Sequence, residues 1–186
     1  MRHAMHGTRC LGVCLVAAAV IGPVLGAPAE AGDRLPIHGS FRGTFRSETS
    51  PLLGPAVVHM EAEGTLSHFG RARAVTTSPD VSVDLLRFVL VLGTASWSGV
   101  ITAANGDELH GTYTYRAREV PFSPVTGQFS YVADLAITGG TGRFAGAAGS
   151  GIVTGIGNGF TDPWTFSVVI EGTISMNRAR AGRPTQ

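Results

Sequence analysis

The chain has 186 residues and a formal net charge of +1, and 44% of its residues are hydrophobic. All fourteen basic residues are arginines, and the chain after residue 31 carries no strong excess of either charge. This near-neutral composition lacks the basic footprint of a nucleic-acid-binding protein. About 155 residues remain after removal of an N-terminal export signal, which is enough for one domain with its own hydrophobic core.

The N-terminal segment, residues 1–31, has the pattern of a secretory signal peptide. A basic start that includes Arg2 precedes an apolar stretch, 10–25, which is interrupted before it reaches the length of a spanning helix. Small residues follow, and cleavage is expected after Ala31, with Ala29 as the alternative. A lipoprotein modified at Cys14 and a retained membrane anchor are weaker alternatives.

Both cysteines of the chain lie inside this signal. The mature protein therefore has no disulfide bond and must be held together by packing alone. We expect a secreted or periplasmic protein with no nucleic-acid partner and with no membrane insertion after signal cleavage. The single domain is expected over residues 32–176, and residues 177–186, with three arginines among small residues, are expected to form a disordered tail.

The mature chain is predicted to be all-β, because stretches rich in Val, Ile, Thr, Phe and Tyr alternate with Gly, Pro, Asn and Asp. One segment, 79–92, is ambiguous, since its run of Leu and Val fits either a buried strand or a short helix. Residues 81–92 are also the candidate surface for a homo-oligomer. The number of strands in one domain suggests a closed barrel or a sandwich. The expected strands are 37–46, 57–67, 71–77, 94–103, 108–117, 128–138, 148–156 and 165–175.

The turn at Asn105 and Gly106 fixes the register of one hairpin. A two-residue turn would mix apolar and polar residues on each face of the hairpin. A three-residue loop with Gly106 in the left-handed conformation of a bulge instead places Trp97 opposite Tyr113 and Gly99 opposite Gly111. The second register is preferred, and the facing glycines mark a position where the sheet can bend.

Strict alternation along the strands predicts an apolar lumen and a charged outer face. In the expected strand 37–46, for example, Phe41 and Phe45 share one face, and Arg42 and Arg46 share the other. Few polar groups remain to face the lumen, and they are the candidate ligand-binding residues. These candidates are His68, Trp97, Tyr113, Tyr115 and Tyr131.

The glycine-rich segment 139–147 looks at first like a phosphate-binding loop. Such loops require a following helix, whereas here another β-stretch begins within a few residues. We therefore interpret Gly139, Gly140 and Gly142 as a tight turn that carries Phe144 into one end of the barrel. In this interpretation Arg143 is solvated or paired.

The same glycine-rich segment, together with 67–71 and 102–107, resembles exported bacterial proteins of the allene oxide cyclase barrel-like group, and the glycine-rich part is similar to that of plant dirigent proteins. The resemblance covers residues 37–175. It implies an eight-stranded antiparallel closed β-barrel of calycin-like shape, whose lumen takes apolar small molecules and which is often oligomeric in the plant relatives. It carries over no catalytic residue.

Metal-dependent and nucleophilic catalysis find little support in the sequence. His59, Glu61 and Glu63 share one strand face, but that face is the outer one and no second ligand cluster accompanies them. No cysteine and no nucleophile elbow occurs in the mature chain. Catalytic residues therefore stay unknown, and neither a metal nor a cofactor is expected.

Three functions remain open. The uncharged lumen favours the first and the third of them. The first is the binding of an apolar small molecule inside the barrel. The second is a cofactor-free isomerase or cyclase like the resembling plant proteins. The third is a structural or surface-interaction protein whose barrel is filled by its own side chains. Lumen glycines, including Gly43 and Gly64, are expected to leave room for a ligand.

Overall fold

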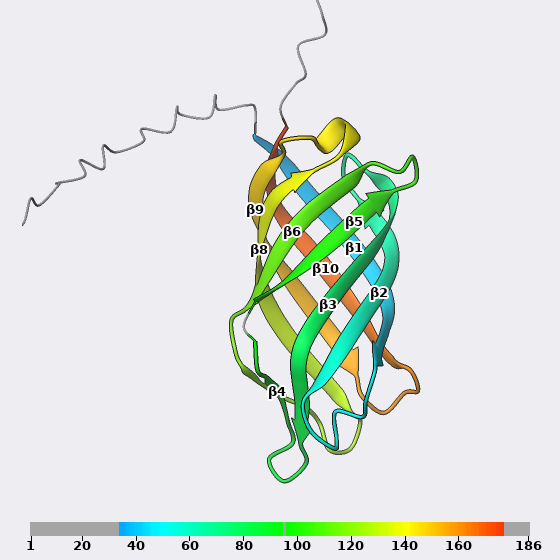
Figure 1. Ribbon diagram of the computed structural model, residues 1–186, viewed down its shortest axis with the longest axis vertical. Helices are drawn as coiled ribbons and strands as arrows, with labels where there is room; N and C mark the ends of the chain where they lie inside the picture. The colour runs from blue at the N-terminus through cyan, green and yellow to red at the C-terminus, as the bar shows by residue number, and fades with distance from the viewer. Residues whose placement is uncertain (1–33, 95, 177–186) are drawn as a thin grey trace, which may run out of the picture.

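The protein is an all-β structure built around a closed eight-stranded antiparallel β-barrel (Figure 1). The computed structural model describes residues 34–94 and 96–176, so the expected signal peptide and C-terminal tail lie outside the described residues. In the described part no helix is long and apolar enough to cross a membrane. The elements in chain order are β1 (Arg34–Ser47), β2 (Ala56–Leu66), β3 (Gly70–Asp84), β4 (Val89–Leu92), β5 (Ser96–Ala103), β6 (Glu108–Tyr115), β7 (Glu119–Pro121), β8 (Gln128–Gly140), the 3₁₀ helix η1 (Gly142–Phe144), β9 (Ala148–Asn158) and β10 (Trp164–Ser175).

The barrel runs β1-β2-β3-β5-β6-β8-β9-β10 and closes where β10 pairs with β1. Every pairing is antiparallel. In the pairing of β1 with β10, the register runs from Arg34 opposite Ser175 to Phe45 opposite Trp164. Closure leaves no unpaired barrel edge, which removes the main aggregation hazard of a β-sheet.

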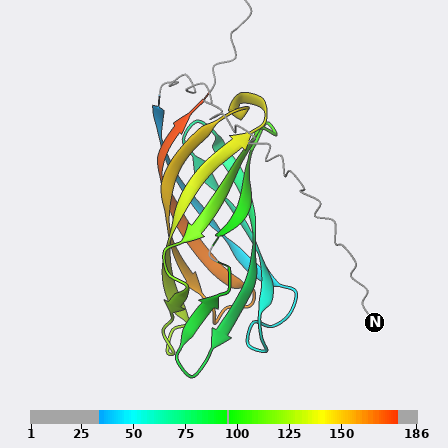
Figure 2. The ribbon, with the colours of Figure 1, turned by 60° about the vertical axis from the view of Figure 1, so that its left-hand side comes forward.

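Residues 79–92 form strands rather than a helix. β3 continues to Asp84, and β4 returns antiparallel to it and pairs on its other side with β7. Asp84 closes the tip of this hairpin, because its Oδ1 accepts hydrogen bonds from the backbone N–H groups of Leu86 and Arg87. The extension formed by β4 and β7 stands beside one end of the barrel (Figure 2).

The predicted hairpin register is confirmed. Trp97 is paired with Tyr113 and Gly99 with Gly111. The backbone N–H of Gly106 donates to the carbonyl of Ala103, and Gly106 has the positive φ of 89° that the bulged loop requires.

The alternation of the strands holds around the barrel. Along β8, Phe129, Tyr131, Ala133, Leu135 and Ile137 are buried, and the residues between them are exposed or partly so. The buried residues from all strands form one core cluster in the lumen. Because no disulfide lies in the described residues, this packing carries the stability of the barrel.

One end of the barrel is closed by aromatic packing. Phe69, from the turn after β2, stacks on Phe144 of η1 with ring centroids 3.8 Å apart. The glycine-rich segment is thus a turn that buries Phe144, as predicted from the sequence, and the side chain of Phe144 is only 1% exposed. Arg143 is paired, since its Nε donates to Asp107 Oδ2 at 2.7 Å.

Gly142 is required at this closed end for two reasons. Its φ is +55°, and an added Cβ would lie 1.8 Å from Oδ1 of Asp107. Asp107 cannot easily move away, because Asn105 and Arg143 both donate hydrogen bonds to its carboxylate. The same two hydrogen bonds, that of Asn105 first, hold the pKa of Asp107 below its usual range.

We therefore predict that Gly142→Ala destabilises the barrel more than Gly70→Ala. Gly70 has a similar φ of +71° but open space around its Cβ position, so its replacement costs only the left-handed backbone penalty, about 1 kcal/mol. Gly142→Ala adds the displacement of Asp107 and should cost two to three times as much, roughly. Urea unfolding of both variants measures the difference, and equal losses would show that the Asp107 contact is unimportant.

Candidate functional site

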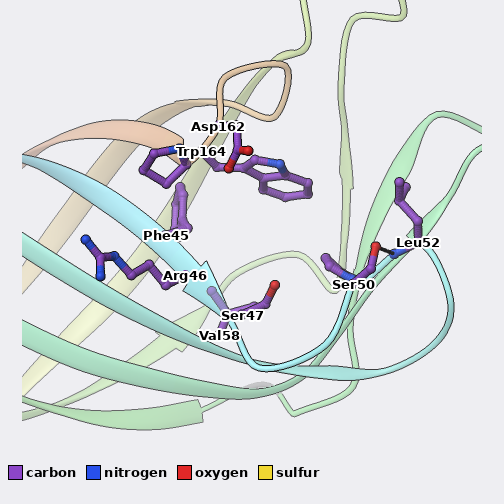
Figure 3. A pocket seen from close by; sticks show the side chains of 10 residues that line it. Phe45, Arg46, Ser47, Ser50, Leu52, Val58, Asp162 and Trp164 are labelled. Carbon is purple, nitrogen blue, oxygen red and sulfur yellow. Dashed lines mark hydrogen bonds between the residues drawn. The ribbon is translucent and has the colours of Figure 1, made fainter.

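The candidate site is a line of cavities that runs from the open end of the barrel into the lumen. At the open end lies a cleft of about 560 Å³ between the β1–β2 loop and the start of β10. Figure 3 shows Phe45, Asp162 and Trp164 gathered on one side of this cleft, with Ser50 and Leu52 on the other. Its floor is formed by the apolar side chains of Phe45, Val58 and Trp164.

Two small cavities continue from this cleft into the barrel. The outer one, of about 30 Å³, shares Phe45, Val58 and Trp164 with the cleft, so a single layer of side chains separates the two. The inner one, of about 50 Å³, shares Met60 with the outer one. Methionine is flexible and polarisable, which makes Met60 the easiest of these partitions to move.

An aromatic column lines this path. Trp97 and Tyr115 lie 3.9 Å apart between ring centroids, and Tyr115 meets the ring of Tyr131 edge-on at 5.5 Å. On the side of the open end, Phe45 packs against Phe129 and, at 4.6 Å, against Phe166. Rings of this kind present flat apolar faces together with a few polar atoms, as small-molecule sites commonly do.

Two polar atoms in the path are buried without a hydrogen-bond partner. They are Nε1 of Trp97, a residue that lines the inner cavity, and Oγ of Ser78, a residue that lines the outer one. A buried donor that makes no hydrogen bond costs about 1–3 kcal/mol, so such atoms are rare in native proteins. An acceptor placed in these cavities would recover that energy.

The structure brings four of the five predicted ligand-binding residues together. Trp97, Tyr113 and Tyr131 line the inner cavity, and Tyr115 lines the outer one. The expected inward orientation of His68 is wrong. His68 is exposed at the closed end with a φ of 69°, and its Nε2 hydrogen-bonds to the carbonyl of Pro36 at 3.0 Å, because β2 ends at Leu66 and the turn breaks the alternation.

The expectation that lumen glycines leave room is also wrong. A Cβ on Gly43 would lie 1.9 Å from the carbonyl oxygen of Glu61, and one on Gly64 would lie 2.0 Å from that of Ser40. A Cβ on Gly99 would lie 2.4 Å from Cγ2 of Thr76 and 2.8 Å from the ring of Tyr113. These glycines permit close approach of neighbouring strands and rings, and the space that remains in the lumen lies elsewhere.

Sequence reasoning missed Ser78, Met60 and Trp164 as lining residues. Ser78 continues the inward phase of β3, but in the sequence the following Pro79 and Asp80 indicate a strand end. In the structure β3 continues, and the pairing of β2 with β3 shifts register between Ala56 and Val58, close to Ser78. On the outer face, His59 contacts Glu48 and Thr77. Residues 34–94 and 96–176 hold no group of three or more side chains placed to bind a metal.

The lumen offers hydrogen-bond donors but no base. Among the described residues, no carboxylate, guanidinium or imidazole is buried. Burial raises the pKa of Tyr113 to about 12 and also raises the pKa of Tyr115 and Tyr131. The three hydroxyls therefore stay protonated at neutral pH, where they can donate to a ligand but cannot remove a proton from it.

Comparison with known proteins adds little to this picture. No family model matches the chain, and no curated protein matches it. Among solved structures it is similar to a pterocarpan synthase dirigent protein, with 16% identity and a TM-score of 0.43 over 86% of this chain and 94% of that one. The assignment of the closed barrel rests on the strand pairing itself.

The buried tyrosines lead to a prediction for alkaline solution. The unfolded chain loses tyrosine protons near pH 10, whereas burial raises the pKa of Tyr113 to about 12 in the folded chain and also raises the pKa of Tyr115 and Tyr131. In that window the folded state binds more protons, so stability falls as pH rises, by about 1.4 kcal/mol per pH unit for each tyrosine.

This titration is simple to read, because the chain has three tyrosines and no lysine. We expect tyrosinate absorbance at 295 nm to appear together with the loss of circular dichroism, above pH 10. A full tyrosinate signal at pH 10.5 from a folded protein would contradict the burial of these hydroxyls.

Proposed function

We propose that this protein is exported and that its barrel holds an apolar small molecule carrying a hydrogen-bond acceptor. The ligand enters through the cleft at the open end and extends toward Trp97. The observation that carries the proposal is the unpartnered Nε1 of buried Trp97, a residue that lines the inner cavity together with Tyr113 and Tyr131.

Binding in this site requires side chains to move. Together the two lumen cavities are far below the roughly 300 Å³ at which small-molecule pockets begin, while the cleft at the open end is within that range. Displacement of Met60 and of the Phe45–Trp164 layer would join the three spaces. In this proposal the ligand-free barrel is a closed form, and part of the binding free energy of the ligand is used to open it.

A structural, side-chain-filled barrel is the second candidate, and the small volume of the cavities favours it. Eight strands give an interior that side chains alone can fill. This candidate does not explain why Nε1 of Trp97 and Oγ of Ser78 are buried without a hydrogen-bond partner. A third candidate, the cofactor-free isomerase or cyclase suggested by the resemblance to allene oxide cyclase and dirigent proteins, would have to act through tyrosine or tryptophan donors, because the lumen supplies no base.

The test compares two probes of nearly the same shape, 1-tetralone and tetralin, of which only the ketone has an acceptor. We expect 1-tetralone to bind the mature protein about tenfold more tightly, the value of one recovered hydrogen bond. In Trp97→Phe this preference should disappear, because phenylalanine has no hydrogen-bond donor. The ratio of the two affinities is the readout, since the smaller ring also leaves a cavity in the core. Tryptophan fluorescence and native mass spectrometry measure the two affinities and any molecule retained from the host.

His68→Ala is the matched control, since His68 is exposed at the other end of the barrel. It should leave both affinities unchanged, whereas Tyr113→Phe should weaken the binding of the ketone. If neither probe binds and no host molecule is retained, the filled structural barrel becomes the better account.

A second prediction concerns Met60. Met60→Ala removes the side chain between the two lumen cavities and should cost about 2–5 kcal/mol of stability. The same change should strengthen the binding of tetralin, because the apolar probe no longer has to displace the methionine. Ile156→Ala, on the outer wall, serves as control and should change neither quantity much. A destabilised Met60→Ala with no gain in tetralin affinity would argue against the continuous path.

A further inference from the structure

The exposed hydrophobic side chains of this protein are concentrated at the open end of the barrel. Four separate loops at that end each carry at least one of them: the β1–β2 loop, the tip between β3 and β4, the β7–β8 loop and the β9–β10 loop. All four loops project from the same end of the barrel (Figure 1). The exposed residues there are Leu52, Leu53, Leu85, Leu86, Phe88, Val125 and Phe160.

The most prominent of these side chains make almost no contact with the rest of the protein. Leu86 is 94% exposed, Leu53 is 89% exposed and Val125 is 84% exposed. They belong to three different loops, the β1–β2 loop, the tip between β3 and β4, and the β7–β8 loop. Exposed leucines at loop tips cost solubility, and such a concentration at one end marks an interaction surface.

We propose that these loop tips dock on a zwitterionic phospholipid surface, so that the open end of the barrel faces the bilayer. Isolated apolar projections suit a fluid lipid layer, which closes around each side chain. A protein partner, in contrast, would need a matching hollow for each of the separate tips. The docking is shallow, and no segment crosses the bilayer.

The charges at the open end determine which kind of surface fits. The segments 45–55, 80–90, 118–128 and 158–164 together contain three arginines and five carboxylates. One of the arginines, Arg87, is held by Glu119 in a two-point contact. The end is thus net acidic, which disfavours an anionic lipid surface and also disfavours end-to-end contact with a second copy of the same acidic face.

The two ends of the described chain lie away from the open end (Figure 1). Arg34 and Ser175 are paired at the opposite end, near the stacked rings of Phe69 and Phe144, and the described chain begins and ends there (Figure 1). The cleft lies at the same end as the apolar tips, and Leu52 of the β1–β2 loop lines it. A bilayer against this end would present apolar molecules directly to the cleft.

The experiment is flotation of the mature protein with phosphatidylcholine vesicles. We expect the wild type to float with the vesicles, and the double variant Leu53→Ser with Leu86→Ser to lose at least about tenfold in apparent partitioning. Both side chains are almost fully exposed, so the variant should keep its melting temperature. The matched control is Ile152→Ser with Ile156→Ser, which removes two exposed side chains from the barrel wall and should float like the wild type.

Added salt and anionic lipid complete the test. Flotation should persist in about 0.5 M salt and should not increase when phosphatidylserine is included, because apolar contacts drive it. Trp97→Phe should float normally, which separates this proposal from ligand binding in the lumen. Failure of the wild type to float, equal flotation of the loop-tip variant, dependence on anionic lipid, or a wild-type dimer that the loop-tip variant abolishes would each overturn the proposal.

Discussion

The width of the lumen is the constraint on which the rest of this structure depends. Eight antiparallel strands close through the pairing of β1 with β10, and strand number sets the interior to a size that side chains can just fill. Each inward residue is therefore either part of the packed core or part of a site. The same confinement makes single unsatisfied atoms informative, because a buried donor without a partner, such as Nε1 of Trp97, costs about 1–3 kcal/mol.

The two ends of the barrel differ in kind. At one end, Phe69 and Phe144 stack and the Asp107–Arg143 contact holds the glycine-rich turn over them. At the other end the loops are long, the cleft opens between them, and the apolar side chains of the tips point to solvent. The closed end is thus held by ring stacking and an ion pair, whereas the open end is formed by loops, the part of a scaffold that most often carries binding sites.

The sequence was sufficient for the barrel and for most of the lumen, because period-two alternation and the chemistry of the Asn105–Gly106 turn are local signals that agree with the global fold. It failed where backbone geometry departs from regular strands. His68 lies in a turn that breaks the phase of β2, and Ser78 lies beside an irregularity that resembled a strand end. The volume of the lumen was unpredictable for a further reason: the space opposite a glycine depends on neighbouring strands, and in the case of Gly99 the side chains of Thr76 and Tyr113 occupy it.

The site and the apolar tips together suggest why this barrel needs no buried charge. A ligand that is poorly soluble in water arrives most readily from a lipid surface, and a lumen with donors but no carboxylate accepts it without the cost of desolvating an ion. The protonated tyrosines and the indole N–H of Trp97 would then orient the polar end of the ligand, while Met60 and the Phe45–Trp164 layer decide whether the path is open. In the proposed arrangement, the energy needed to displace the aromatic side chains would limit the affinity. Hydrogen bonds from the unpartnered donors would offset part of this energy, but only for a ligand that carries an acceptor.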